Sequence, residues 1–225
     1  MVKASVIIPT YNDSGYLERC VRSVAGQPGV GEIVVVDDCS TEPFAPALGR
    51  FLASVRGLSL VRNHQNMGLS ASRNIGVGAA LNPVVFPLDC DDYAMPGVVA
   101  VLAKKIEDGF DVAYGDMEEG SCGGAVARPF TGAFSGEVFA ASNPIYCSSA
   151  FTRSLWKRVG GYREVHGVEF YEDYDFWCRC FVAGARFGYA PGVVYYHTFR
   201  PGGMLQRLKA EGQAKKEFST RSLRF

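Results

Sequence analysis

Short apolar segments rich in β-branched residues alternate with segments of helical periodicity through the first half of the chain. The apolar segments predict strands at Ala4–Ile8, Ile33–Val36, Leu58–Val61, Val84–Leu88 and Asp111–Tyr114. Strands that alternate with helices over short links predict an α/β fold, with a mostly parallel central sheet that carries helices on both faces.

The helical segments lie between consecutive predicted strands. They are the segment with Leu17, Cys20, Val21 and Val24 on one face, then Ala45–Ser54, Leu69–Leu81, and a segment that begins at Pro96 and buries Val98, Val99, Leu102 and Ile106. Many small residues in Leu69–Leu81 predict close packing of its backbone against neighbours. Pro9 should end the first strand, because proline cannot donate a ladder hydrogen bond.

The pattern changes after Gly115. Glycine, serine and aromatic residues dominate Gly120–Asn143 and predict irregular strands and loops. Helices follow near Ser154–Val159 and at Glu172–Val182, and Val193–Tyr196 predicts a last strand. Because no repeat or long flexible linker interrupts the chain, we expect one domain over 1–225, with unequal halves at 1–115 and 116–197 and a tail at 198–225.

Composition excludes several classes of protein. Apolar residues make up 48% of the 225 residues and charged residues 20%, which excludes intrinsic disorder. Lys plus Arg equals Asp plus Glu at 23 each, so no global positive field indicates a nucleic-acid partner. The tail is basic, with seven basic and two acidic residues from Thr198 to Phe225. It is either a solvated end, a partner contact or a peripheral contact with the inner face of a membrane.

The sequence also predicts a compartment. No run reaches the roughly 18 to 20 apolar residues that span a bilayer, and the first apolar stretch is too short for a signal peptide. The seven cysteines are odd in number and have no CxxC spacing, which favours free thiols in a reducing environment. We therefore expect a cytoplasmic location.

Polar side chains follow three predicted strands, at Thr10–Asp13, Asp37–Asp38 and Asp89–Asp92. Ligands of open parallel sheets bind beyond the carboxyl ends of the strands. Asp89 and Asp91 should point the same way, because side chains alternate along an extended chain. Two carboxylates at one spot repel unless a cation or donors lie between them. They suit Mg²⁺ or Mn²⁺ completed by ligand phosphates, and the alternative is a solvated turn.

Two further features have both a structural and a functional interpretation. Glu172 and Asp173 open a helix, where carboxylates either favour the helix dipole or, beside aromatic neighbours, supply a general base. His197 ends the last apolar strand and is either a hydrogen-bonded core histidine or a ligand. Phosphate loops of the Walker and dinucleotide types are absent, since Gly76-Val77-Gly78 follows no strand. The serine, cysteine and histidine residues show no sequence pattern typical of a catalytic nucleophile, so a catalytic triad is not expected.

Taken together and in order, these segments resemble family 2 inverting glycosyltransferases of the GT-A fold. The matching segments are Ser5–Asn12 and Val34–Ser40 at the start, Asn66–Asn74 for the family's segment ending in Arg-Asn, Leu88–Asp92 for its DxD motif, and Trp156–Glu164 followed by Tyr171–Trp177 on the acceptor side. The resemblance implies a single Rossmann-like GT-A domain. Residues 1–115 would bind the nucleotide sugar, and a smaller mixed half at 116–197 would bind the acceptor.

The resemblance also implies roles for individual residues. The donor-binding residues would be Pro9, Thr10, Tyr11, Asp38, Arg73, Asp89 and Asp91. The uracil would lie against the backbone of Pro9 and Thr10, stack on Tyr11 and donate its ring N–H to Asp38. Arg73 would lie against the nucleotide, and Asp89 would contact the ribose or the sugar. Asp91 would coordinate a divalent metal that bridges the phosphates, with His197 as an additional ligand. Asp173, beside Glu172, would be the base in a single in-line displacement.

The implied cofactor is Mn²⁺ or Mg²⁺, and the implied partners are a nucleotide-sugar donor, in particular a UDP-sugar, and a glycan, lipid-linked or protein acceptor. Gly115–Ser142 and the tail are candidates for a lid. A sugar nucleotidyltransferase is a second class, although Thr10–Ser14 lacks the glycine-rich basic loop of those enzymes. A phosphoacceptor module would need an Asp and a Lys that the third and fifth strands lack. A catalytically inactive binding protein of the same fold is a further alternative.

Overall fold

The protein is described from a computed structural model, which covers residues 2–121, 124–128, 134–141, 143, 145–164 and 171–199. The elements run in the order β1 (Ala4–Thr10), α1 (Ser14–Val24), β2 (Val30–Asp37), α2 (Pro46–Ser54), β3 (Leu58–Arg62), α3 (Leu69–Ala79), β4 (Val84–Pro87), β5 (Tyr93–Ala94), α4 (Val98–Glu107), β6 (Val112–Ser121), β7 (Gly124–Arg128), α5 (Gly136–Ala141), β8 (Ala150–Thr152), α6 (Arg153–Val159), α7 (Glu172–Val182) and β9 (Phe187–Thr198).

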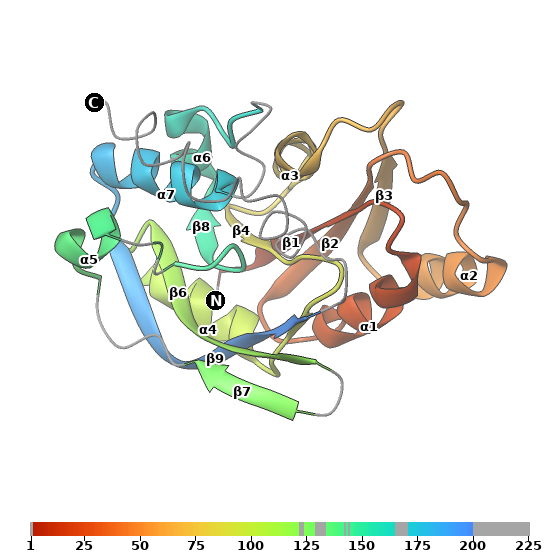
Figure 1. Ribbon diagram of the computed structural model, residues 1–225, viewed down its shortest axis with the longest axis horizontal. Coiled ribbons are helices and arrows are strands. Elements are labelled where there is room, and N and C mark those ends of the chain that lie inside the picture. The colour runs from red at the N-terminus through yellow and green to blue at the C-terminus, as the bar shows by residue number, and fades with distance from the viewer. Residues whose placement is uncertain are drawn as a thin grey trace.

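The strands form one curled sheet in the order β3-β2-β1-β4-β8-β6-β9-β5, and β7 pairs with β6 (Figure 1). Strands β1 to β4 pair in parallel, and so do β6 and β9. The short strand β8 runs antiparallel between β4 and β6. This arrangement confirms a mostly parallel sheet with a mixed second half.

Two apolar layers cover the sheet. Strand β1 is buried along its whole length, with Val6 and Ile8 facing one layer and Ile7 the other. Helices α1, α2 and α4 pack on the first face, and α3, α6 and α7 pack on the second (Figure 1). The buried residues of α1 are the four that the helical spacing predicts. Both faces of the sheet are therefore covered, as the β-branched strands require.

Some predicted boundaries were wrong. Pro9 lies inside β1, opposite Val36 of β2, instead of ending the strand. Strand β4 pairs with β1 only as far as Ile7, so the missing N–H of Pro9 interrupts no ladder on that side. Pro96 does not take the first position of α4, because the left-handed N-cap residue Gly97 lies between it and Val98, where the helix begins.

The two halves meet inside a strand. The predicted division at residue 115 falls within β6, whose first residues pair with β8 and whose later residues pair with β7. Strand β9 begins at Phe187, well before the predicted Val193. The tail from Arg200 onward lies outside the described residues, and so does part of the predicted lid segment. Among the helices that the structure describes, none has the length and apolar character needed to cross a bilayer.

Gly76 permits the close packing of α3 on the sheet. A Cβ at this position would lie 2.3 Å from Cγ2 of Ile7 and 3.2 Å from Cγ2 of Val36. Both neighbours are stiff β-branched side chains in the buried layer. We expect Gly76→Ala to lower the free energy of unfolding by about 1–3 kcal/mol through overpacking.

Gly78 lies on the same helix and provides a matched control, because a Cβ at this position would meet nothing within 4 Å. Gly78→Ala should raise stability by about 0.5–1 kcal/mol, since alanine favours the helix. Urea denaturation of both variants measures the difference. Equal effects of the two substitutions would contradict the packing role of Gly76.

Candidate active site at the carboxyl edge of the sheet

The loops after β1 and β2 are held together by short polar contacts. Asn12, in a left-handed conformation with φ 55°, donates its backbone N–H to Oγ of Ser40 at 3.0 Å. Its side-chain oxygen accepts from the backbone N–H of Thr41 at 2.9 Å. The ends of the two strands therefore form one fixed rim. On that rim Pro9 and Thr10 are buried, whereas Tyr11 is 39% exposed and open to a stacking partner.

Asp38 ties this rim to the start of α3. Its buried carboxylate accepts hydrogen bonds from Nδ2 of Asn63 at 2.7 Å and from the backbone N–H groups of Met67 at 2.9 Å and Gly68 at 2.8 Å. The carboxylate thus organises the loop that enters α3. Its contact with a uracil N–H stays a prediction, which would use a remaining lone pair.

Arg73 is the central cation of the site. Its guanidinium donates to Glu172 at 2.5 Å and to Asp89 at 2.7 Å, although the side chain is only 1% exposed. The guanidinium also lies over the ring of Tyr162, 5.6 Å from the centroid. Arg73 therefore joins the acidic segment after β4 to the first turn of α7. The predicted direct contact of Arg73 with a nucleotide stays a prediction.

The two acidic residues of α7 differ in environment. Glu172 is 6% exposed and is engaged by Arg73. Asp173 is half-buried, and burial together with the neighbouring Glu172 charge raises its pKa from 3.8 to about 7. After β4, burial acts to raise the pKa of Asp89, but the charge and hydrogen bond of Arg73 outweigh it and hold that pKa below its usual value. Burial also raises the pKa of Glu172, although the charge of Arg73 opposes that rise. The protonation of Asp173 therefore changes near neutral pH.

Asp92 is a site residue that the motif analysis missed. It is fully buried and lies 3.2 Å from Nδ1 of His197, while its other oxygen accepts from the backbone N–H of Thr198 at 2.9 Å. Although burial opposes a charged imidazole, Asp92 raises the pKa of His197 to about 9. Strand alternation gave no signal for this contact, because β4 ends at Pro87 and Asp89–Asp92 is a turn, in which the backbone N–H of Asp92 donates to the backbone oxygen of Asp89 at 3.0 Å. The predicted common direction of Asp89 and Asp91 assumed an extended chain, which this turn replaces.

Asp91 lies beside this pair and is half-buried. The loop that carries it is fixed by Arg19 of α1, which donates to the backbone oxygen of Asp91 at 2.5 Å and to Oγ1 of Thr198 at 2.8 Å. Within the described residues, no three His, Cys, Asp or Glu side chains gather closely enough to hold a metal by themselves. Any divalent ion here would need ligands from a bound phosphate, which is the usual arrangement for Mg²⁺.

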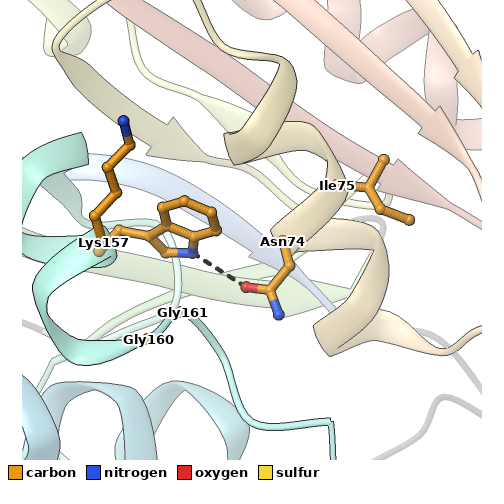
Figure 2. A pocket seen from close by; sticks show the side chains of 6 residues that line it. Asn74, Ile75, Lys157, Gly160 and Gly161 are labelled. Atoms are coloured by element: carbon orange, nitrogen blue, oxygen red, sulfur yellow. Dashed lines mark hydrogen bonds between the residues drawn. The ribbon is translucent and has the colours of Figure 1, made fainter.

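A separate pocket of about 480 Å³ lies beside α3 and α6 (Figure 2). Asn74 organises its wall by accepting from Nε1 of Trp156 at 3.1 Å and from the backbone N–H of Tyr162 at 2.8 Å. Gly161 is left-handed, with φ 73°, and a Cβ there would meet Oδ1 of Asn74 at 2.6 Å. Asn74 thus fixes α6 and the segment that follows it to α3.

The fold and the carboxyl-edge site define a class of protein, the GT-A-like α/β proteins. Residues 5–162 match the family described as "Glycosyl transferase family 2", and the chain belongs to that family. The structure is similar to S. aureus TarS 1–349 in complex with UDP-GlcNAc, with a TM-score of 0.73 and 24% identity over 91% of this chain and 60% of that one. This likeness confirms the predicted fold.

Two relatives illustrate the range of similarity. The succinoglycan biosynthesis protein ExoU of Rhizobium meliloti is 26% identical over 202 residues, which cover 81% of this chain and 58% of that protein. The uncharacterized protein MT1568 of Mycobacterium tuberculosis is 37% identical over 105 residues, or 46% of this chain and 32% of that one. The chain thus spans less than two thirds of the length of each of these relatives.

Proposed function

We propose that the protein transfers a sugar from a UDP-sugar to the hydroxyl of a glycan acceptor, with inversion, and that Asp173 is the general base. The observation that carries the proposal is the Arg73 bridge, which joins Asp89 on the donor side to the acid pair on α7. Family membership supports the class of reaction. The TarS complexes with UDP and UDP-GlcNAc support a uridine donor, and the name of ExoU supports a glycan acceptor.

The proposed reaction is a single displacement. Asp173 takes the proton of the acceptor hydroxyl while that oxygen forms a bond to the anomeric carbon. The bond from the anomeric carbon to the diphosphate oxygen breaks, and UDP leaves. A carboxylate with a pKa of about 7 suits this step, because a base works best when its pKa lies near the working pH. Glu172 cannot take this role easily, since Arg73 already holds it.

Donor binding is assigned to the rim of the sheet. Tyr11 would stack on the uracil, with the backbone of Pro9 and Thr10 and the carboxylate of Asp38 along its edge. Asp89, fixed by Arg73, would accept from a ribose or sugar hydroxyl. These roles keep the donor over the ends of β1, β2 and β4, where open α/β sheets bind their ligands.

The residues also fit a divalent ion shared with the donor. Asp91 would be the protein carboxylate. His197 would offer Nε2 after loss of its proton to the solvent, because its Nδ1 is turned to Asp92 in the manner of metal-bound histidines. Bound Mg²⁺ or Mn²⁺ would neutralise the charge that develops on the leaving diphosphate. Arg19 would keep the Asp91 loop and the end of β9 in place for this purpose.

Thermal denaturation with ligands tests the proposal. UDP at about 100 times its dissociation constant should stabilise the fold by roughly 2.7 kcal/mol. We expect a rise in Tm with UDP in Mn²⁺ or Mg²⁺ that EDTA removes, and no such rise with NADH. Assays of UDP release from UDP-sugars then identify the donor.

The other outcomes are equally informative. A response to GDP or TDP in place of UDP would contradict the uridine donor. A response to UDP that EDTA leaves unchanged would contradict the metal. Binding of UDP without UDP release from any UDP-sugar, with or without added glycans, would favour an inactive binding protein of this fold.

A further inference from the structure

Asn143 lies between α5 and β8, outside the sequence segments that carry the family resemblance. Its Nδ2 donates to Oδ2 of Asp173 at 3.2 Å. Its own Oδ1 accepts from the backbone N–H of Ile145 at 3.3 Å, so the nitrogen of the side-chain amide faces Asp173. A donor in this position favours the ionised form of a carboxylate.

The segment that carries Asn143 is anchored against α7. Ile145 is fully buried and Phe139 is 3% exposed. The backbone oxygen of Phe139 accepts from the Tyr174 hydroxyl at 2.6 Å, and the two rings meet edge to face with centroids 5.4 Å apart. Asn143 is therefore held at a fixed place beside the first turn of the helix.

Both oxygens of Asp173 are oriented by these neighbours. Oδ1 accepts from the backbone N–H of Tyr174 at 2.7 Å, and Oδ2 accepts from Asn143. Each carboxylate oxygen has two lone pairs, so Oδ2 keeps one for an acceptor hydroxyl. The contact with Asn143 fixes the rotation of the carboxylate plane, and a base is effective only when its lone pair lies within reach of the proton.

We infer that Asn143 is a positioning residue for the proposed base: it fixes the plane of the Asp173 carboxylate and stabilises its ionised form. This inference rests on the proposed function and deepens it. It assigns a role to the region after Gly120, for which the sequence offers no specific motif.

Several groups around Asp173 set its pKa together with Asn143. Burial and Glu172 raise the pKa of Asp173, while Arg73 from α3, the Tyr174 backbone and Asn143 lower it. Four further neighbours keep their protons at neutral pH because burial raises the pKa of each: Cys147, Tyr162, Cys178 and Tyr195. Removal of the Asn143 donor should therefore move the titration of Asp173 upward.

Titration of the Asp173 carboxyl carbon by ¹³C NMR on the full chain tests the contact directly. The signal is assigned by its loss in Asp173→Asn. In Asn143→Ala the midpoint should rise by about one pH unit, the scale of one hydrogen bond to a charged group. Asn143→Asp has the same size, which protects folding, and its added negative charge should raise the midpoint further.

Asn82→Ala is the matched control, because Asn82 donates to Glu32 at 3.1 Å at the opposite end of β1. It should leave the Asp173 midpoint unchanged. In UDP release from the UDP-sugar that the wild-type protein turns over, the acid limb of the pH profile should move with the midpoint in both Asn143 variants and stay in place in Asn82→Ala.

The outcomes separate this inference from the proposed function. An unmoved midpoint, or a moved midpoint with an unmoved acid limb, would overturn the role of Asn143. A moved midpoint in a protein that releases no UDP from any UDP-sugar would overturn the proposed function, while the contact between Asn143 and Asp173 would stand.

Discussion

Replacement of Asp173 by Asn should reduce sugar transfer by about 10³-fold, the scale of a lost general base, while UDP binding is retained. Asn keeps the size of the side chain and can still accept from the backbone N–H of Tyr174, but it cannot take the proton of an acceptor hydroxyl. UDP release assays and the UDP-dependent rise in Tm measure the two effects separately. Transfer at the wild-type rate would remove Asp173 from the base role.

The same substitution should stabilise the folded protein at alkaline pH. The folded-state pKa of Asp173, about 7, lies above its ordinary value of 3.8, so the folded chain holds this proton to a higher pH than the unfolded chain. The contribution of Asp173 to stability therefore declines as pH rises from about 4 to about 7. Asp173→Asn has no such titration. It should exceed wild type by about 1 kcal/mol or more at pH 8 and lose that advantage toward pH 4.

Asp175 gives a control of opposite sign on the same helix. Its carboxylate accepts from Arg163 at 2.9 Å and from Arg179 at 2.8 Å, and it is 7% exposed. Asp175→Asn should lower stability, because it leaves these cations with a neutral partner. Urea denaturation at pH 5 and pH 8 compares both variants. A loss of stability at pH 8 in both Asp173→Asn and Asp175→Asn would contradict the claim that the ionised Asp173 carboxylate destabilises the fold. Function at this position is thus expected to cost stability.

Local pattern predicted the elements whose burial is set by their own residues. Helix α7 occupies the predicted Glu172–Val182, and α1 buries the predicted face. The short strands β5 and β8 carry too few residues for a period, so only their pairing with β9, β4 and β6 defines them. Strand β9 was predicted too short, because Gly188 and Pro191-Gly192 interrupt its apolar pattern while its register with β6 shifts around Asp116.

In the site, too, local sequence predicted some residues but not the partners that are distant in sequence. The acidic residues at strand ends and at the start of α7 follow from local pattern. Their partners do not: Arg73 and Glu172 are 99 positions apart, and Asp92 and His197 are 105 apart. Asn143 belongs to a stretch without periodicity, which offers no signal for its contact with Asp173. The pairings therefore depend on how the two halves of the sheet close on each other.

The second large effect is expected at Arg73. Arg73→Met keeps an apolar stem of similar length but leaves Asp89 and Glu172 without their cation, and Glu172 is almost fully buried. Removal of one member of a buried ion pair costs about 3–5 kcal/mol, mainly because the partner charge stays buried. We expect a loss of that size by urea denaturation. The exposed pair of Arg22 and Glu18 is the control, and Arg22→Met should cost less than about 1 kcal/mol.

A double-mutant cycle tests whether Arg73 acts as the counter-ion of Glu172. Glu172→Gln removes the buried charge, so Arg73→Met should cost less in the Glu172→Gln background, with a coupling of about 1–3 kcal/mol. Additive losses would show that Arg73 contributes through packing alone. Arg73→Lys separates charge from geometry, because a single ammonium cannot reproduce the planar fork that reaches both carboxylates. It should recover part of the stability but leave Asp89 and Glu172 unjoined, so UDP-sugar turnover should stay low even where the protein is folded.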